Sequence, residues 1–284
     1  MRQRVVFLLA AGAISLVAAG AALAGTTTVT PAHMHGWSAV NDTCGAPSTG
    51  AIGFVTGPST PPAGSGSVQL TVGSNGDSYP TLRTAHFDGV KLSSLTALDY
   101  WTYVSHAGSG SQAPYIDLYV DWNGDGVRDD IVTFEPVYQT SQSVALNTWQ
   151  HWDALHGLWW SDNLGGPPPL FTLSSYLSTH PDATILGGSE QSFILAAGCG
   201  GSAWTNFVGN ADELTVGVNG NNSTYDFEPT IGPPTSKSQC MHGGWKTFNN
   251  PSFKNQGQCV SYVEHHTNRG STKSKKHHHH NHHS

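Results

Sequence analysis

Apolar and polar residues alternate with a period of two along much of the chain, which is the pattern of half-buried β-strands. In the stretch 67–72, Val68, Leu70 and Val72 fall on one face. The stretch 97–104 is rich in the aromatic and β-branched residues that pack on a pleated surface. Comparable patterns predict further strands at 51–55, 115–120, 130–135, 147–152, 192–197, 213–218 and 223–227.

About eight to ten short strands separated by turn residues are typical of two antiparallel sheets packed face to face. The sequence therefore predicts an all-β, jelly-roll-like sandwich. One short helix is expected at 172–178, where Leu173, Tyr176 and Leu177 recur at helical spacing before the breaking pair His180-Pro181. No repeat of fixed period is present, which argues against a solenoid or a propeller.

The chain divides into five predicted regions. A basic start, an apolar stretch to Val17 and the small-x-small site Ala22-Leu23-Ala24 predict a secretory signal peptide. The regions are a signal peptide at 1–24, the sandwich at 25–230, a Pro- and Ser-rich linker at 231–238, a cysteine-bracketed segment at 239–266 and a disordered His-rich tail at 267–284. We therefore expect a secreted, extracellular protein without membrane insertion, because no segment approaches the roughly 20 apolar residues of a membrane span.

Composition narrows the partners. Charged residues make up 11% of the chain, while 33 Gly and 16 Pro indicate frequent turns. Between residues 25 and 266, six Lys and Arg stand against 19 Asp and Glu. Nucleic acid and anionic lipid are poor partners for such a surface, since like charges repel. Divalent cations and glycans remain open.

Four cysteines in an exported chain predict two disulfides, for which three pairings exist. Cys240 and Cys259 lie close together and apart from the other two, so we expect them to pair. That assignment leaves Cys44 with Cys199.

The most specific local motif is the acidic stretch 121–130. Oxygen-bearing side chains at alternating positions, a Gly at 126 and two further carboxylates can enclose a hard cation, for which calcium is expected. The candidate ligands are Asp121, Asn123, Asp125, Asp129 and Asp130. The stretch resembles the calcium loops of EF-hands and integrin-type propeller repeats, although no helices flank it. The alternative is a plain hairpin, because Asn-Gly and Asp-Gly pairs also favour tight turns.

A second motif places four tryptophans within twelve residues. Sugars bind flat aromatic faces together with a few amides and carboxylates. The predicted ligand-binding residues are Trp149, Trp152, Asp153, Trp159 and Trp160. The alternative is that these tryptophans fill the core of the sandwich.

Support for catalysis is weaker. A glycosidase needs two carboxylates facing each other across the scissile bond. Carboxylates are available at Glu135, Glu190, Asp212 and Glu213, but none has a diagnostic spacing. The sequence lacks the motifs of serine hydrolases, zinc proteases and phosphate-binding loops, so we assign no catalytic residue.

Two stretches resemble segments of other proteins. Residues 210–229 resemble the closing strands of secreted bacterial lectin-like or carbohydrate-binding-module-like sandwiches, in which an Asp before the final strand often helps to hold a structural calcium; Asp212 is the matching position. The pattern from Cys240-Met-His-Gly-Gly-Trp245 to Phe253-Lys-Asn-Gln-Gly-Gln-Cys259 resembles a cysteine-bracketed C-terminal segment of secreted bacterial proteins of unknown function.

Together these features predict a non-catalytic binding protein for carbohydrate or another cell-envelope component, with a structural calcium ion. The alternatives are a polysaccharide-acting hydrolase and a structural protein of the cell surface.

Overall fold

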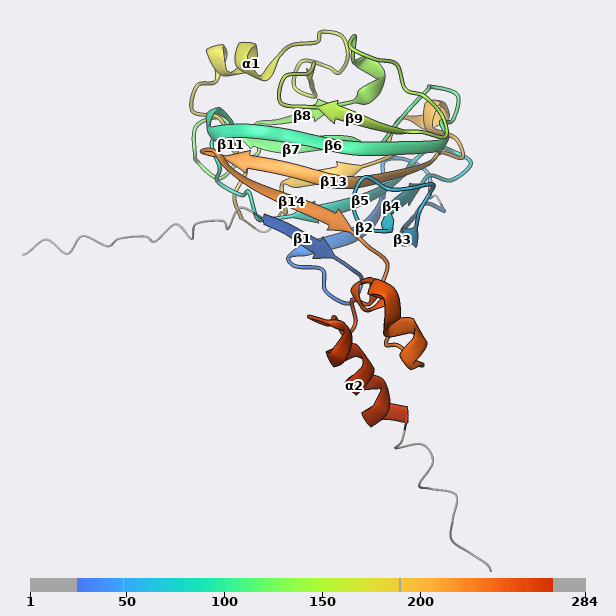
Figure 1. The fold of residues 1–284 in the computed structure, drawn as a ribbon. Helices are drawn as coiled ribbons and strands as arrows, with labels where there is room; N and C mark the ends of the chain where they lie inside the picture. Colours follow the sequence, from blue (N-terminus) through green and yellow to red (C-terminus); the bar gives the residue numbers. More distant parts are fainter. Residues whose placement is uncertain (1–24, 48, 189, 268–284) are drawn as a thin grey trace, which may run out of the picture.

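Two β-sheets pack face to face in this protein, and a small helical unit follows them at the C-terminal end (Figure 1). The computed structural model describes residues 25–47, 49–188 and 190–267. The predicted signal peptide and the His-rich tail beyond residue 267 lie outside these residues. The predicted all-β sandwich is confirmed.

Seven strands form each sheet in the described part of the chain. The first sheet contains β1 (Gly25–Val29), β14 (Asn221–Phe227), β13 (Val208–Val218), β4 (Gly66–Thr71) and β3 (Ala51–Thr56) in that order, with β6 (Leu95–His106) on β13 and β9 (Trp149–Asp153) on β6. The second contains β10 (Trp160–Ser161), β8 (Asp130–Phe134), β7 (Tyr115–Asp121), β12 (Phe193–Ala196), β5 (Ser78–Thr84) and β2 (Trp37–Thr43), with β11 (Thr184–Ile185) on β7. Neighbouring strands are antiparallel, except that β1 runs parallel to β14.

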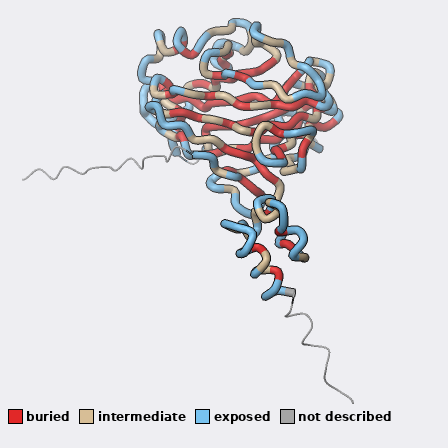
Figure 2. Tube along the Cα trace, in the orientation of Figure 1, coloured by how far each residue is buried: buried red, intermediate tan, exposed pale blue. Residues whose placement is uncertain are grey.

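The core lies between the two sheets, where buried positions concentrate (Figure 2). Strand alternation turns Val68 and Leu70 of β4 toward Leu118 and Val120 of β7, and all four side chains have no exposed surface. Burying a side chain of this size contributes about 1.5–3 kcal/mol. The interior therefore provides the main stabilisation of the sandwich.

Helices are short and lie outside the sheets. The predicted helix is present as α1 (Leu173–Thr179), whose first turn is capped by the Thr172 hydroxyl accepting from the Ser175 N–H at 3.2 Å. In the described ranges, the remaining helices are η1 (Leu92–Ser94), η2 (Pro136–Tyr138), η3 (Gly201–Trp204), η4 (Lys237–Thr247) and α2 (Gln256–Thr267).

The C-terminal unit has a small core of its own. Cys240 in η4 is bonded to Cys259 in α2, with a Cα–Cα distance of 5.7 Å. Phe248 and Val263 complete this core, and Ile231 packs against it. Because the Ile231 N–H also donates to the Asn249 side chain at 2.7 Å, the segment predicted as a linker contributes contacts to the unit.

The second disulfide joins Cys44, after β2, to Cys199, after β12, with a Cα–Cα distance of 5.3 Å. Both expected pairings are therefore confirmed. Among the described residues, no helix has the length and apolar character needed to cross a membrane.

Candidate functional site

A groove lined by aromatic side chains runs over the outer face of the second sheet. Since alternate residues of a strand share a face, residues spaced two apart on β7 and β8 point into it together. The cavity has a volume of about 550 Å³. Its principal lining residues are Tyr79, Tyr115, Asp117, Tyr119, Arg128, Thr133, Glu135, Tyr138, Trp160 and Asp162.

Asp117 lies at the floor of this groove. Its two carboxylate oxygens accept hydrogen bonds from the hydroxyls of Tyr79 and Thr133, each at 2.5 Å. Only 6% of the residue is exposed. Burial raises the pKa of Asp117 to about 6, although both hydroxyls and the nearby Arg83 oppose the increase. The carboxyl is therefore oriented by two strands and titrates near neutral pH.

Glu135, directly after β8, supplies a second carboxyl to the groove. One oxygen accepts a hydrogen bond from the Trp160 indole N–H at 2.9 Å, and 8% of the residue is exposed. Burial raises the pKa of Glu135 to about 7, and the charge of Asp117 adds to the increase. Asp117 pairs with Thr133 in the β7–β8 ladder, and Glu135 follows two residues later, directly after β8. Diagonal neighbours on paired strands have Cα atoms roughly 7–8 Å apart.

The two arginines near these carboxyls, Arg83 and Arg128, interact with other side chains. The Arg83 guanidinium forms an ion pair with Asp42 at 3.0 Å. The Arg128 guanidinium lies 4.6 Å from the ring centre of Tyr119, in cation–π geometry. Among the described residues, no ion pair reaches Asp117 or Glu135.

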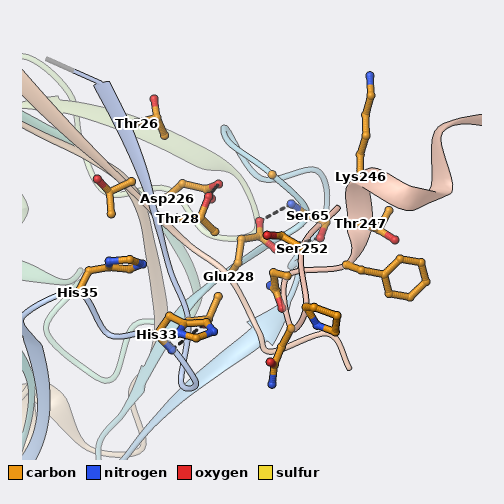
Figure 3. Close-up of a pocket in the computed structure, with 17 residues that line it drawn as sticks. Thr26, Thr28, His33, His35, Ser65, Asp226, Glu228, Lys246, Thr247 and Ser252 are labelled. Atoms are coloured by element: carbon orange, nitrogen blue, oxygen red, sulfur yellow. Dashed lines mark hydrogen bonds between the residues drawn. The ribbon is translucent and has the colours of Figure 1, made fainter. Parts of the chain in front are cut away.

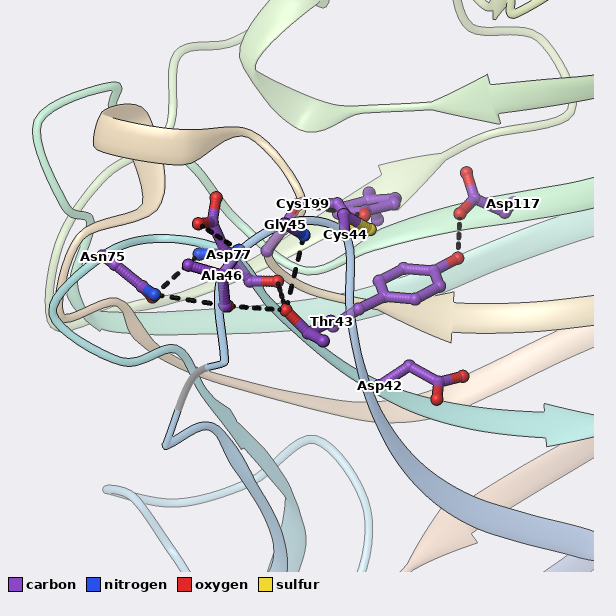
Figure 4. The surroundings of a disulfide bond; sticks show 12 residues. Asp42, Thr43, Cys44, Gly45, Ala46, Asn75, Asp77, Asp117 and Cys199 are labelled. Atoms are coloured by element: carbon purple, nitrogen blue, oxygen red, sulfur yellow. Dashed lines mark hydrogen bonds between the residues drawn. A yellow bond between two sulfur atoms is a disulfide. The ribbon is translucent and has the colours of Figure 1, made fainter.

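The Cys44–Cys199 disulfide lines one end of the groove. The Cys44 N–H donates to the Asp77 carbonyl at 2.9 Å, and the Thr43 hydroxyl donates to the Ala46 carbonyl at 2.9 Å (Figure 4). These contacts connect the rim to the neighbouring loop. The end of the groove is therefore braced covalently and by hydrogen bonds.

The predicted tryptophan patch is not a single surface. Trp152 and Trp159 are 1% and 0% exposed, and their indole N–H groups donate to Thr102 Oγ1 and the Ala154 carbonyl, each at 2.8 Å. The prediction that these two rings contact a ligand is wrong, because both faces are packed in the core.

The other predicted ligand-binding residues lie on two different sheets. Trp149 lies on the first sheet with its ring centre 5.6 Å from that of Tyr103. Asp153, on the same strand, contacts His156 Nδ1 at 2.8 Å. Trp160 alone lines the groove.

Sequence reasoning missed most of the groove. The alternation Tyr115-x-Asp117-x-Tyr119 lies inside a correctly predicted strand and would have indicated an aromatic and acidic face. Tyr79 gave no such signal, since the strand that carries it contains Pro80 and was not predicted.

The acidic loop after β7 is held mainly by its own backbone. Asp121 accepts N–H groups from Asn123 at 3.0 Å, Gly124 at 2.6 Å and Gly126 at 2.8 Å. Although burial raises the pKa of Asp121, these N–H donors outweigh it and lower the pKa. Asp125 accepts from Val127, and Asp129 from Trp122.

The six predicted calcium ligands do not converge. Asp130 leaves the opposite face of the sheet from Asp121, where it accepts hydrogen bonds from Ser161 and Tyr176. Asp212 lies in the first sheet and accepts the Phe227 N–H at 2.9 Å. Within the described ranges, no group of three or more His, Cys, Asp or Glu residues is arranged to hold a metal ion.

Asp121, Asn123, Asp125 and Asp129 remain together in one loop, and their oxygens are of the type that calcium prefers. Calcium in this loop stays a prediction. Calcium at about 100 times its Kd should raise the free energy of unfolding by roughly 2.7 kcal/mol. Thermal melts with calcium and with chelator should therefore differ in wild type and coincide in Asp125→Asn. Identical melts in wild type would leave the plain hairpin as the explanation.

A larger cavity, of about 1060 Å³, lies between the sandwich and the C-terminal unit (Figure 3). Asp226 lines it from β14, Glu228 from the position directly after β14, and Lys246 from η4. Glu228 accepts N–H groups from Ser65 and Gly66 and so braces the neighbouring loop. The cavity offers few aromatic faces, and the groove on the second sheet is therefore the stronger candidate.

Comparisons with known proteins show no matching family model and no matching curated protein. Among solved structures, an arabinose-bound α-L-arabinofuranosidase matches with 12% identity and a TM-score of 0.37, covering 66% of this chain and 24% of that chain. The binding domain of Paraclostridial Mosquitocidal Protein 1 matches with 13% identity and a TM-score of 0.30, covering 61% and 44%. The chain thus spans less than half of either structure, and matches at these TM-scores assign it neither a family nor a ligand.

Proposed function

We propose that this chain is a secreted binding protein whose groove on the second sheet holds carbohydrate. The observation that carries the proposal is the combination, in one cavity, of several aromatic rings with two buried, oriented carboxyls. The confirmed disulfides and the predicted signal peptide support an extracellular site of action.

The chemistry of the groove suits sugars. Aromatic faces match the apolar C–H surfaces of a sugar ring, while carboxyls accept hydrogen bonds from its hydroxyls. Trp160, Tyr79 and Tyr138 are half-buried, so their rings keep part of their surface open to the groove. The cavity volume of about 550 Å³ lies within the usual range for small-ligand sites.

Binding is favoured over hydrolysis by the state of Asp117. Glu135 has a pKa of about 7, which would suit a general acid. Hydrolysis also needs a second carboxylate that reaches the sugar or a water molecule. Asp117 directs both oxygens to Tyr79 and Thr133 and is almost fully buried, so it is poorly placed for that role.

Replacing Trp160 tests the proposal. Trp160→Ala should weaken retention by at least about tenfold, because truncating a central aromatic residue of a binding site typically has an effect of this size. The measurement is affinity electrophoresis through a panel of polysaccharides. Trp101→Ala is the matched control, since Trp101 is half-buried on the first sheet, with its ring 5.1 Å from that of His151.

Two results would redirect the assignment. Release of reducing ends by wild type, lost in Glu135→Gln, would make the protein a hydrolase. Absence of retention on every polysaccharide in the panel would contradict carbohydrate binding and favour a structural role.

A further inference from the structure

We propose that, if the groove binds carbohydrate, it selects amino sugars, whose protonated amine is held by Glu135 beside the buried charge of Asp117. This inference rests on the proposed function and specifies its substrate class. The two carboxyls face the same cavity, because Asp117 lies on β7 and Glu135 directly follows the neighbouring strand β8.

The charged groups around these carboxyls leave an acidic excess. Asp117 interacts electrostatically with Arg83 and with the exposed carboxyl of Asp162, and Glu135 interacts with Asp117. Arg83 is paired with Asp42, and Arg128 lies over Tyr119. The groove therefore presents three carboxyls and only Arg128 as a cation without a carboxylate partner.

Asp117 and Glu135 are buried, so their negative charge is poorly solvated. A carboxylate without a cationic partner is costly in a desolvated position, and both pKa values are raised accordingly. A ligand ammonium group would relieve that cost through charge-assisted hydrogen bonds. A neutral sugar offers only hydroxyl donors, which compensate a buried negative charge less well.

The net negative charge of the described residues also favours a positively charged ligand. The described part of the chain carries all 19 Asp and Glu residues and only six Lys and Arg. Such a field raises the local concentration of cationic ligands and speeds their association, in a manner that salt weakens. The acidic excess therefore favours a cationic glycan over an anionic one.

Isothermal titration calorimetry of the whole mature chain tests the inference. The probes are glucosamine oligosaccharides and their N-acetylated counterparts of equal length, because acetylation removes the charge. We expect the amine form to bind about ten- to a hundred-fold more tightly at low salt, as charge-assisted hydrogen bonds exceed neutral ones by this order. This advantage should shrink as salt is added.

Substitutions locate the charge that matters. Glu135→Gln keeps an oxygen that can accept from the Trp160 indole, and Asp117→Asn keeps one that can accept from the hydroxyl of Tyr79 or Thr133. Each substitution removes a negative charge and should therefore remove most of the preference for the amine form. Asp182→Asn is the matched control, since Asp182 is exposed and paired with Lys91. Circular dichroism establishes that each variant is folded.

The pH profile gives a second readout. Affinity for the amine form should rise as pH increases through about 6–7, where Asp117 and Glu135 ionise. It should fall again once the ligand amine loses its proton. The N-acetylated form should show no such maximum.

The outcomes separate the two proposals. Equal affinity for amine and N-acetylated forms, with Trp160→Ala still abolishing both, would overturn amine selection and leave carbohydrate binding intact. Absence of binding by either form and by the polysaccharide panel would overturn both proposals.

Discussion

Trp159→Ala is expected to lower the free energy of unfolding by about 3–5 kcal/mol, the usual cost of deleting a large core aromatic side chain. Trp159 has no exposed surface, and its ring centre lies 5.7 Å from that of Phe134. The substitution also leaves the Ala154 carbonyl without the indole donor. Urea denaturation monitored by circular dichroism measures the change.

Trp160→Ala serves as the comparison, because the neighbouring residue has the same side chain on the opposite face. Its half-buried ring should contribute much less to stability while dominating ligand retention. Comparable losses of stability in the two variants would contradict the assignment of Trp159 to the core and Trp160 to the groove.

Glu135→Gln should make the free protein more stable at pH 8, by on the order of 3 kcal/mol, since a shift of one pKa unit corresponds to about 1.4 kcal/mol. The folded-state pKa is about 7 and the ordinary value is 4.5. The folded state therefore binds the proton more tightly between these values, and wild-type stability falls as pH rises from about 4.5 through 7. Gln keeps an acceptor for Trp160 and carries no charge to bury.

Denaturant titrations at pH 5 and pH 8 measure this effect. The difference between the two pH values should be smaller in Glu135→Gln than in wild type and unchanged in Asp182→Asn. Asp117, with a pKa of about 6, should retain part of the dependence in both proteins. An unchanged pH dependence in Glu135→Gln would show that this carboxyl is not desolvated as described.

The stability cost and the proposed binding role have one physical origin. The groove holds two carboxyls in a desolvated position where a cation would stabilise them. A variant that becomes more stable when a carboxyl is removed, and at the same time loses ligand preference, follows the common trade-off between stability and function at binding sites.

Much of the strand content was predictable because the pattern is local. Alternation in 67–72 and 115–120 places one face of each strand in the core, and both segments are strands. Thr172 and the pair His180-Pro181 set the limits of α1 through capping and the loss of a backbone donor. The strand β5 escaped prediction because Pro80 and Arg83 interrupt its pattern, while pairing with β12 and β2 stabilises it.

The aromatic stretch shows where local information ends. Adjacent tryptophans in a strand point to opposite faces. Around Trp159 and Trp160 both faces carry apolar residues, so the pattern does not indicate which face is buried. Only the packing of the second sheet against the first determines which ring is inside. The same holds for Asp121 and Asp130, which are close in sequence and leave opposite faces of the sheet.

The sequence by itself determined the β-sandwich class, the short helix, the paired cysteines and the acidic character of the chain, because each depends on local periodicity, backbone constraints or composition. Tertiary structure alone decided the groove. Tyr79, Asp117 and Thr133 come from three strands, and their side chains meet through hydrogen bonds across 38 and 16 residues of sequence. Strand order and register create such a site, and these are set by the packing of the whole sandwich rather than by any one segment.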